Sequence, residues 1–158
     1  MSSILIKGGN FLLNVGPDDT GKIPAVSKEI FQEAGDWYQR IYESIIDTDF
    51  ISVGNHQFTR RGNTVYLHLP PAYGCSGVRL TPFTVAPVSG VLLNSGETVD
   101  AVVEYTPLDY DGNKNTAHLH LKKIPAKQYM GENMVIKMEF EDADSFFNSA
   151  NDDKEVLL

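Results

Sequence analysis

Residues 9–17 read Gly9-Asn10-Phe11-Leu12-Leu13-Asn14-Val15-Gly16-Pro17. The apolar run from Phe11 to Val15 is broken only by Asn14 and lies between two glycines and a Gly-Pro pair. This pattern predicts a fully buried strand of the kind found inside parallel sheets. The residues that follow, Asp18 to Lys22, have the composition of a loop.

A helix is predicted from Pro24 to about Ile41. Its apolar residues recur in steps of three and four and form one stripe, namely Val26, Ile30, Ala34, Trp37 and Ile41. Proline suits the first helical position, where its missing N–H is not needed. Gly35 costs about 1 kcal/mol relative to alanine inside a helix, which indicates close packing against a neighbour. Strand, loop and helix make one unit of an α/β fold.

Beyond residue 43 the pattern changes to short alternating strands. The inward residues of three of them are Val65, Leu67 and Leu69; Val99, Ala101, Val103 and Tyr105; and Leu119 and Leu121. The outward positions include His68, His118 and His120, and a strong turn signal stands at Asp111-Gly112-Asn113. Roughly seven or eight short strands separated by turn residues predict an antiparallel β-sandwich.

The chain is therefore expected to be mainly β and to divide into unlike pieces. Residues 1–43 hold the strand-loop-helix unit, and residues 44–142 hold the sandwich domain. Residues 143–158 form an acidic tail that we expect to be disordered, with Phe146 and Phe147 as its only aromatic residues.

Composition excludes several classes of function. The net charge of −8 would repel a phosphate backbone, so a nucleic-acid partner is not expected. Cys75 is the single cysteine, which rules out an internal disulfide and a cysteine-based metal site. No apolar run approaches the roughly 18 residues of a membrane helix, and Met1 to Lys7 lack the features of a signal peptide.

The first motif resembles the end of the catalytic barrel in the α-L-fucosidase family of glycoside hydrolases. The matching residues are Gly9-Asn10-x-Leu12-Leu13-Asn14-x-Gly16-Pro17, Gly21-x-Ile23-Pro24 and Trp37. In the segment Tyr42 to Thr48, which follows the helix, Glu43, Ile45 and Thr48 agree with the family, whereas Tyr42, Ser44 and Ile46 depart from it. Residues 58–66 resemble the opening hairpin of the family's C-terminal β-sandwich, and the resemblance extends from about Lys7 to Asp142.

The resemblance implies a retaining glycosidase acting on terminal α-L-fucosides. In such enzymes one carboxylate is the nucleophile and a second is the acid/base, about 5–5.5 Å apart. In the family both precede the last barrel strand, and no position here matches either. A complete barrel of this type takes about 250 residues. We therefore expect a C-terminal fragment, a split gene product or a chain that completes another, inactive by itself. Family members usually act in the periplasm, in lysosomes or after secretion.

Candidate site residues are few. Asn14 lies near the carboxyl end of the predicted strand, where barrels place their active sites, so it is a candidate for lining a sugar pocket, although its amide equally suits a bond to the following loop. Asp18 and Asp19 resemble a pair of carboxylates but are more typical of a turn. No catalytic residue is nominated.

Other candidates have ordinary explanations. His118 and His120, two apart on a strand, make half of a metal site, but no cysteine or carboxylate spacing completes it, so neither a metal nor a cofactor is expected. Trp37 lies in the apolar stripe and is expected in a core. A sugar platform of Tyr66, Tyr73, Tyr105 and Tyr110 is weighed against ordinary packing, and Cys75 has no base nearby in the sequence.

Two further functions stay open. The sandwich alone is a candidate non-enzymatic module that binds carbohydrate, such as a fucosylated glycan. Alternatively, the orphan strand Phe11–Val15 pairs with another chain, for example in a homodimer, because unpaired backbone groups are a template for association.

Overall fold

The computed structural model describes residues 1–106 and 116–150. Their strands are β1 (Asp49–Val53), β2 (His56–Arg61), β3 (Thr64–Leu69), β4 (Gly77–Leu80), β5 (Ser89–Leu92), β6 (Glu97–Thr98), β7 (Asp100–Thr106), β8 (Thr116–Lys122) and β9 (Met134–Glu139). The helices are α1 (Ser2–Leu5), α2 (Ala25–Ile41) and α3 (Ala143–Ser149), with 3₁₀ turns η1 (Tyr42–Ser44) and η2 (Ala126–Tyr129).

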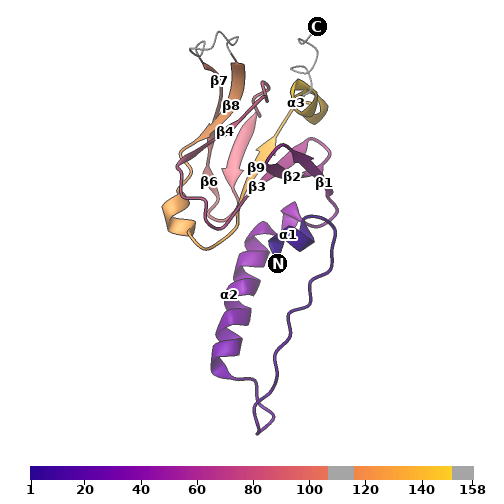
Figure 1. The fold of residues 1–158 in the computed structure, drawn as a ribbon, viewed down its shortest axis with the longest axis vertical. Helices are drawn as coiled ribbons and strands as arrows, with labels where there is room; N and C mark the ends of the chain where they lie inside the picture. The colour runs from indigo at the N-terminus through magenta and orange to yellow at the C-terminus, as the bar shows by residue number, and fades with distance from the viewer. Residues whose placement is uncertain (107–115, 151–158) are drawn as a thin grey trace.

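The strands form two antiparallel sheets. One has the order β1-β2-β3-β9-β5-β6 and the other the order β4-β8-β7. The two sheets face each other above the long helix α2 (Figure 1). The predicted fold class, mainly β with an antiparallel sandwich, is confirmed.

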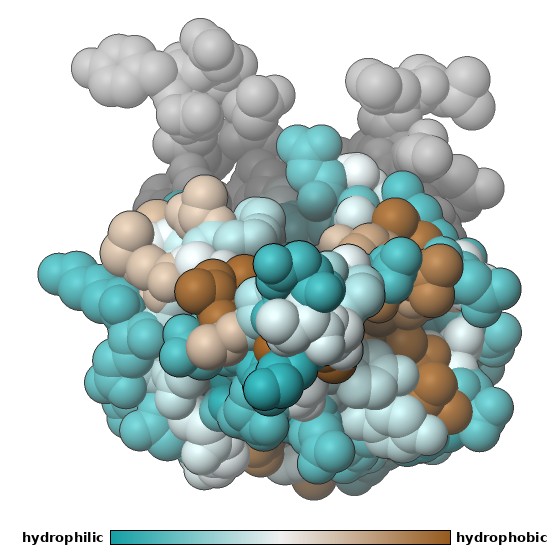
Figure 2. Space-filling model, turned by 90° about the horizontal axis from the view of Figure 1, so that it is seen from below, coloured by the Kyte–Doolittle hydropathy of each residue, from teal (hydrophilic) through white to brown (hydrophobic). Residues whose placement is uncertain are grey.

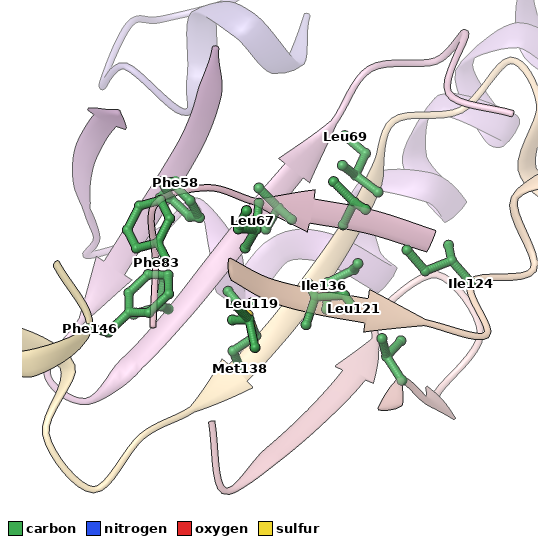
Figure 3. Close-up of a cluster of buried hydrophobic side chains, with 14 of the residues drawn as sticks. Phe58, Leu67, Leu69, Phe83, Leu119, Leu121, Ile124, Ile136, Met138 and Phe146 are labelled. Atoms are coloured by element: carbon green, nitrogen blue, oxygen red, sulfur yellow. The ribbon is translucent and has the colours of Figure 1, made fainter. Parts of the chain in front are cut away.

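The core lies between the sheets and follows the predicted alternation. Leu67 of β3 and Ile136 of β9 come from the six-stranded sheet, and Leu119 and Leu121 of β8 come from the other, all fully buried (Figure 3). Alternation selects these residues because successive side chains on a strand point to opposite faces. Tyr105, predicted to point inward with them, is instead exposed at the end of β7.

Helix α2 covers the outer face of the six-stranded sheet with its C-terminal half. Trp37 and Ile41 form a second buried cluster with Tyr66 and Val135, the outward residues of β3 and β9. The indole Nε1 of Trp37 also donates a hydrogen bond of 3.0 Å to the carbonyl of Asn133. The helix predicted from Pro24 to Ile41 is confirmed, with Pro24 just before its first residue.

Three residues after α2 that the resemblance includes lie at the junction between this helix and the sheet. The Glu43 carboxylate accepts a bond from the Tyr66 hydroxyl at 3.3 Å and pairs with Lys137 Nζ at 3.1 Å. Ile45 packs against the second cluster, and Thr48 Oγ1 donates to the Ile45 carbonyl at 3.1 Å. Their residue types are therefore explained by packing and bonding at the junction.

The predicted strand Phe11–Val15 does not form in this structure. Residues 9–18 contain no helix or strand, and Leu12 is 88% exposed. The reason is the lack of a partner: a buried parallel strand needs parallel neighbours, and every strand pair among the described residues is antiparallel.

The expectation of a disordered tail is wrong for its first part. Residues 143–149 form α3, and its Phe146 is fully buried in the sandwich core. The helix begins after Asp142, whose carboxylate caps it by accepting from the Asp144 N–H at 3.0 Å. Residues 151–158 of the predicted tail lie outside the described residues.

None of the helices in residues 1–106 and 116–150 has the length and apolar character needed to span a membrane.

Candidate functional site

The segment with the family motif projects from the sandwich. Residues 9–24, here called the arm, lead away from α1, turn, and enter α2, which runs back toward the sheets (Figure 1). Phe11 and Leu13 of the arm and Phe31 and Tyr38 of α2 line one groove of about 290 Å³. The arm therefore lies against α2 on one side only.

The other side of the arm and the start of α2 expose apolar residues. Leu12 is 88% exposed, Val26 65% and Ile30 54%, although the last two belong to the predicted apolar stripe. Only Trp37 and Ile41 of that stripe are buried. Figure 2, which views the molecule from the end formed by the arm, shows apolar areas among hydrophilic ones. The arm and the start of α2 thus expose apolar side chains that the described residues leave uncovered.

The tip of the arm is a tightly bonded turn. Asp18 Oδ1 accepts hydrogen bonds from the backbone N–H of Thr20 and Lys22, both at 2.9 Å, and from the Thr20 hydroxyl at 2.7 Å. The Thr20 hydroxyl, followed by the Lys22 N–H, holds the pKa of the Asp18 carboxyl below its ordinary value. Asp18 is the turn former that the sequence favoured.

Asn14 is exposed on the arm, and its Oδ1 accepts a bond from the Val15 N–H at 2.9 Å. This contact is local, and Asn14 does not line the groove between the arm and α2. Its role in lining a sugar pocket stays a prediction.

The proposed tyrosine platform is not assembled. Tyr66 is fully buried under α2, Tyr105 is exposed on the other sheet, and Tyr73 donates its hydroxyl to the Gly77 carbonyl at 2.5 Å. Tyr110 lies outside the described residues. Cys75 is an exposed free thiol, and Trp37 is a packing residue as expected.

His68 is buried rather than solvent-facing, and it borders a groove that Ser2 and Ser3 of α1 also line. Its Nε2 lies 2.8 Å from Thr59 Oγ1, whose hydroxyl donates to the Ser44 carbonyl at 2.5 Å. The Thr59 oxygen must therefore accept from Nε2–H, which leaves Nδ1 unprotonated and without a hydrogen-bond partner among the described residues. Burial lowers the pKa of His68 to about 4.

A carboxylate completes the histidine pair on β8, contrary to expectation. Glu104 Oε2 lies 2.7 Å from His120 Nδ1 and 3.9 Å from His118 Nε2. The sequence signal was the turn at Asp111-Gly112-Asn113, since a hairpin closed near it brings the strand that holds Glu104 beside the strand that holds the two histidines. That turn lies outside the described residues, but β7 pairs with β8 and sets Glu104 opposite His118.

Comparison with known proteins connects the arm with one family. Residues 1–43 match the family model described as alpha-L-fucosidase. No curated protein sequence matches this chain.

Solved structures similar to this fold are α-L-fucosidases. The enzyme from Vibrio sp. strain EJY3 has a TM-score of 0.59 and 27% identity to this chain. The match covers 88% of this chain and 24% of the Vibrio enzyme. Thermotoga maritima α-fucosidase in complex with fucose has a TM-score of 0.55 and 22% identity. The match covers 85% of this chain and 32% of the Thermotoga enzyme. The same enzyme with a mechanism-based inhibitor has a TM-score of 0.54 and 21% identity. That match covers 86% of this chain and 32% of the enzyme.

The chain thus spans about a third or less of the length of these structures. The resemblance to the α-L-fucosidase family that the sequence predicted is confirmed.

Proposed function

We propose that this chain supplies the last strand, loop and helix of a fucosidase-type barrel together with the adjoining β-sandwich, and that it does not hydrolyse fucosides by itself. The observation that carries the proposal is the exposed apolar surface of the arm, which lies within the residues that match the fucosidase family. The parts of the barrel that hold the nucleophile and the acid/base are its partner.

Burial of the arm would be strongly favourable. Covering a leucine, isoleucine or valine side chain contributes about 1.5–3 kcal/mol each, and Leu12, Val26 and Ile30 are all more than half exposed. A strand beside residues 11–15 would also pair backbone groups that now have no strand partner. Both gains appear together only when parallel strands lie next to the arm.

Gly35 supports the same arrangement. A Cβ added at Gly35 would meet nothing within 4 Å among the described residues, so close packing inside this chain does not explain the glycine. Glycine costs about 1 kcal/mol relative to alanine in a helix. Gly35 lines the groove between the arm and α2, where the lack of a side chain would let a partner's residue approach the helix closely.

The Asp18 carboxylate of the arm does not suit the role of a general acid. A general acid in a glycosidase needs a raised pKa, and the pKa of Asp18 is lowered by the bonds of its own turn. Asp18 is therefore a structural residue of the loop.

Hydrolysis of a chromogenic α-L-fucoside tests the proposal. The chain alone should show no turnover, because the displacement needs two carboxyl groups facing one sugar. Co-expression with a fucosidase-type barrel that lacks its last strand and helix should restore turnover. Leu12→Asp should abolish the restoration without unfolding the sandwich, since an exposed substitution changes stability by only about 0.5 kcal/mol.

The matched control is Val88→Asp, which also replaces an exposed apolar residue but lies outside the arm. It should leave the restored turnover unchanged. Turnover by the chain alone, or restored turnover that Leu12→Asp does not affect, would contradict the proposal.

A second copy of this chain is the other candidate occupant of the arm, through residues Phe11–Val15. Sedimentation velocity distinguishes the two cases. A dimer that Leu12→Asp converts to a monomer would favour self-association, whereas a monomer at all concentrations leaves the arm to a separate barrel.

A further inference from the structure

The outer face of the three-stranded sheet carries a group of metal-ligating side chains. His118 and His120 are two residues apart on β8 and therefore lie on one face. Glu104 of β7 is the direct cross-strand partner of His118. β7 and β8 lie at the far end of the molecule from the tip of the arm, so the group is independent of the surface discussed above (Figure 1).

The donor atoms are close enough to share one ion. One nitrogen from each histidine and one oxygen of Glu104 all lie within 4.8 Å of one another. With bonds of about 2.0–2.2 Å, tetrahedral zinc ligands stand about 3.4 Å apart. The two distances from Glu104 Oε2, 2.7 Å to His120 Nδ1 and 3.9 Å to His118 Nε2, lie on either side of that value. Small side-chain rotations are enough to reach it.

The surroundings keep the donors in place. The side chain of His118 is 4% exposed, whereas those of His120 and Glu104 are 20% and 33% exposed. His118 is therefore held by its surroundings, and an ion could reach the group from solvent past His120 and Glu104. Lys122 Nζ bonds the other carboxylate oxygen, Oε1, and leaves Oε2 toward the histidines.

We propose that Glu104, His118 and His120 bind a divalent transition metal ion of the zinc type, with water as the remaining ligand. Two imidazole nitrogens and one carboxylate oxygen suit zinc, whereas magnesium prefers oxygen ligands. Lys122 acts as the outer partner that orients the carboxylate, a role that outer groups commonly have at metal sites.

Calorimetric titration of the metal-free chain with Zn²⁺ tests the proposal. One ion should bind per chain, and Glu104→Gln and His120→Gln should each weaken binding by at least about tenfold. His56→Gln is the matched control, because His56 lies on β2 of the other sheet and should leave the affinity unchanged. Mg²⁺ at the same concentration should give no heat.

Co²⁺ gives a readout that does not depend on the variants' folding. The wild-type chain with Co²⁺ should show the visible absorption of a tetrahedral nitrogen and oxygen site, and only the imidazole NMR signals of His118 and His120 should shift with Zn²⁺. Absence of Zn²⁺ binding, or equal binding by wild type, Glu104→Gln and His120→Gln, would overturn the proposal. Signal shifts at His56 or His68 instead would do the same.

Discussion

Replacing Phe146 with alanine should lower the free energy of unfolding by about 3–5 kcal/mol, the usual loss for a buried phenylalanine. Phe146 is fully buried and stacks on Phe83 with ring centroids 4.3 Å apart. Its ring also lies 4.6 Å from Phe140, 5.0 Å from Phe147 and 5.9 Å from Phe58, so truncation leaves a cavity lined by aromatic rings. Urea unfolding followed by tryptophan fluorescence and circular dichroism measures the loss.

Asn148→Ala is the control for this prediction, because Asn148 is exposed on the same helix. It should change stability by no more than about 0.5 kcal/mol. A loss below about 1 kcal/mol for Phe146→Ala would instead mean that residues 143–149 do not pack in the core and that the expectation of a disordered tail holds there.

Acid should destabilise the chain through His68. The histidine is neutral in the folded protein down to a pKa of about 4 but takes up a proton near pH 6.5 when unfolded. Because the unfolded state then binds more protons, stability is greatest above pH 6.5 and falls as the pH drops from 6.5 to 4. Over that window the loss from this group is about 3 kcal/mol. Chemical unfolding at a series of pH values measures it.

His68→Gln should remove this pH dependence, since glutamine does not titrate and keeps an amide for Thr59. His56→Gln provides the comparison, because burial also lowers the pKa of His56 and adds a contribution of the same sign. If the stability of His68→Gln falls between pH 6.5 and 4 as steeply as that of the wild type, the buried histidine is not the cause.

The sequence predicted those parts of the fold that depend on local periodicity. The α2 stripe and the alternation of Leu67, Leu119 and Leu121 are visible in the order of residues alone, because helices and strands repeat at fixed periods. The burial of His68 was not visible in that way. Its strand alternates correctly, but its outer face lies beside Ser2 and Ser3 of α1, a contact between distant parts of the chain that no local period predicts.

The errors of prediction have physical causes as well. The run Phe11–Val15 has the composition of a buried strand, but a strand requires a neighbour with free backbone groups, and the described sheets offer it none. Phe146 and Phe147 have the composition of an acidic tail around them, but Asp142, four residues before Phe146, is of a residue type that helices prefer as their N-cap.

The candidate sites also divide into residues that local sequence identifies and residues that only strand pairing brings together. Asn14 is a candidate by its position in a motif, and its side chain is exposed on the arm. Glu104 was missed because a carboxylate fourteen residues before His118 becomes its neighbour only through the register of a hairpin, which is a matter of pairing rather than of spacing.

The turn at Asp18 has a consequence for how the arm would dock. Ordering a flexible residue costs roughly 1–2 kcal/mol of conformational entropy. Four hydrogen bonds join Asp18 to Thr20 and Lys22 in this chain alone. They offset the entropy cost of ordering residues 18–22 without a contribution from a partner. If the arm joins a partner sheet as proposed, association would need to order only residues 9–17, because the turn at residues 18–22 is already formed.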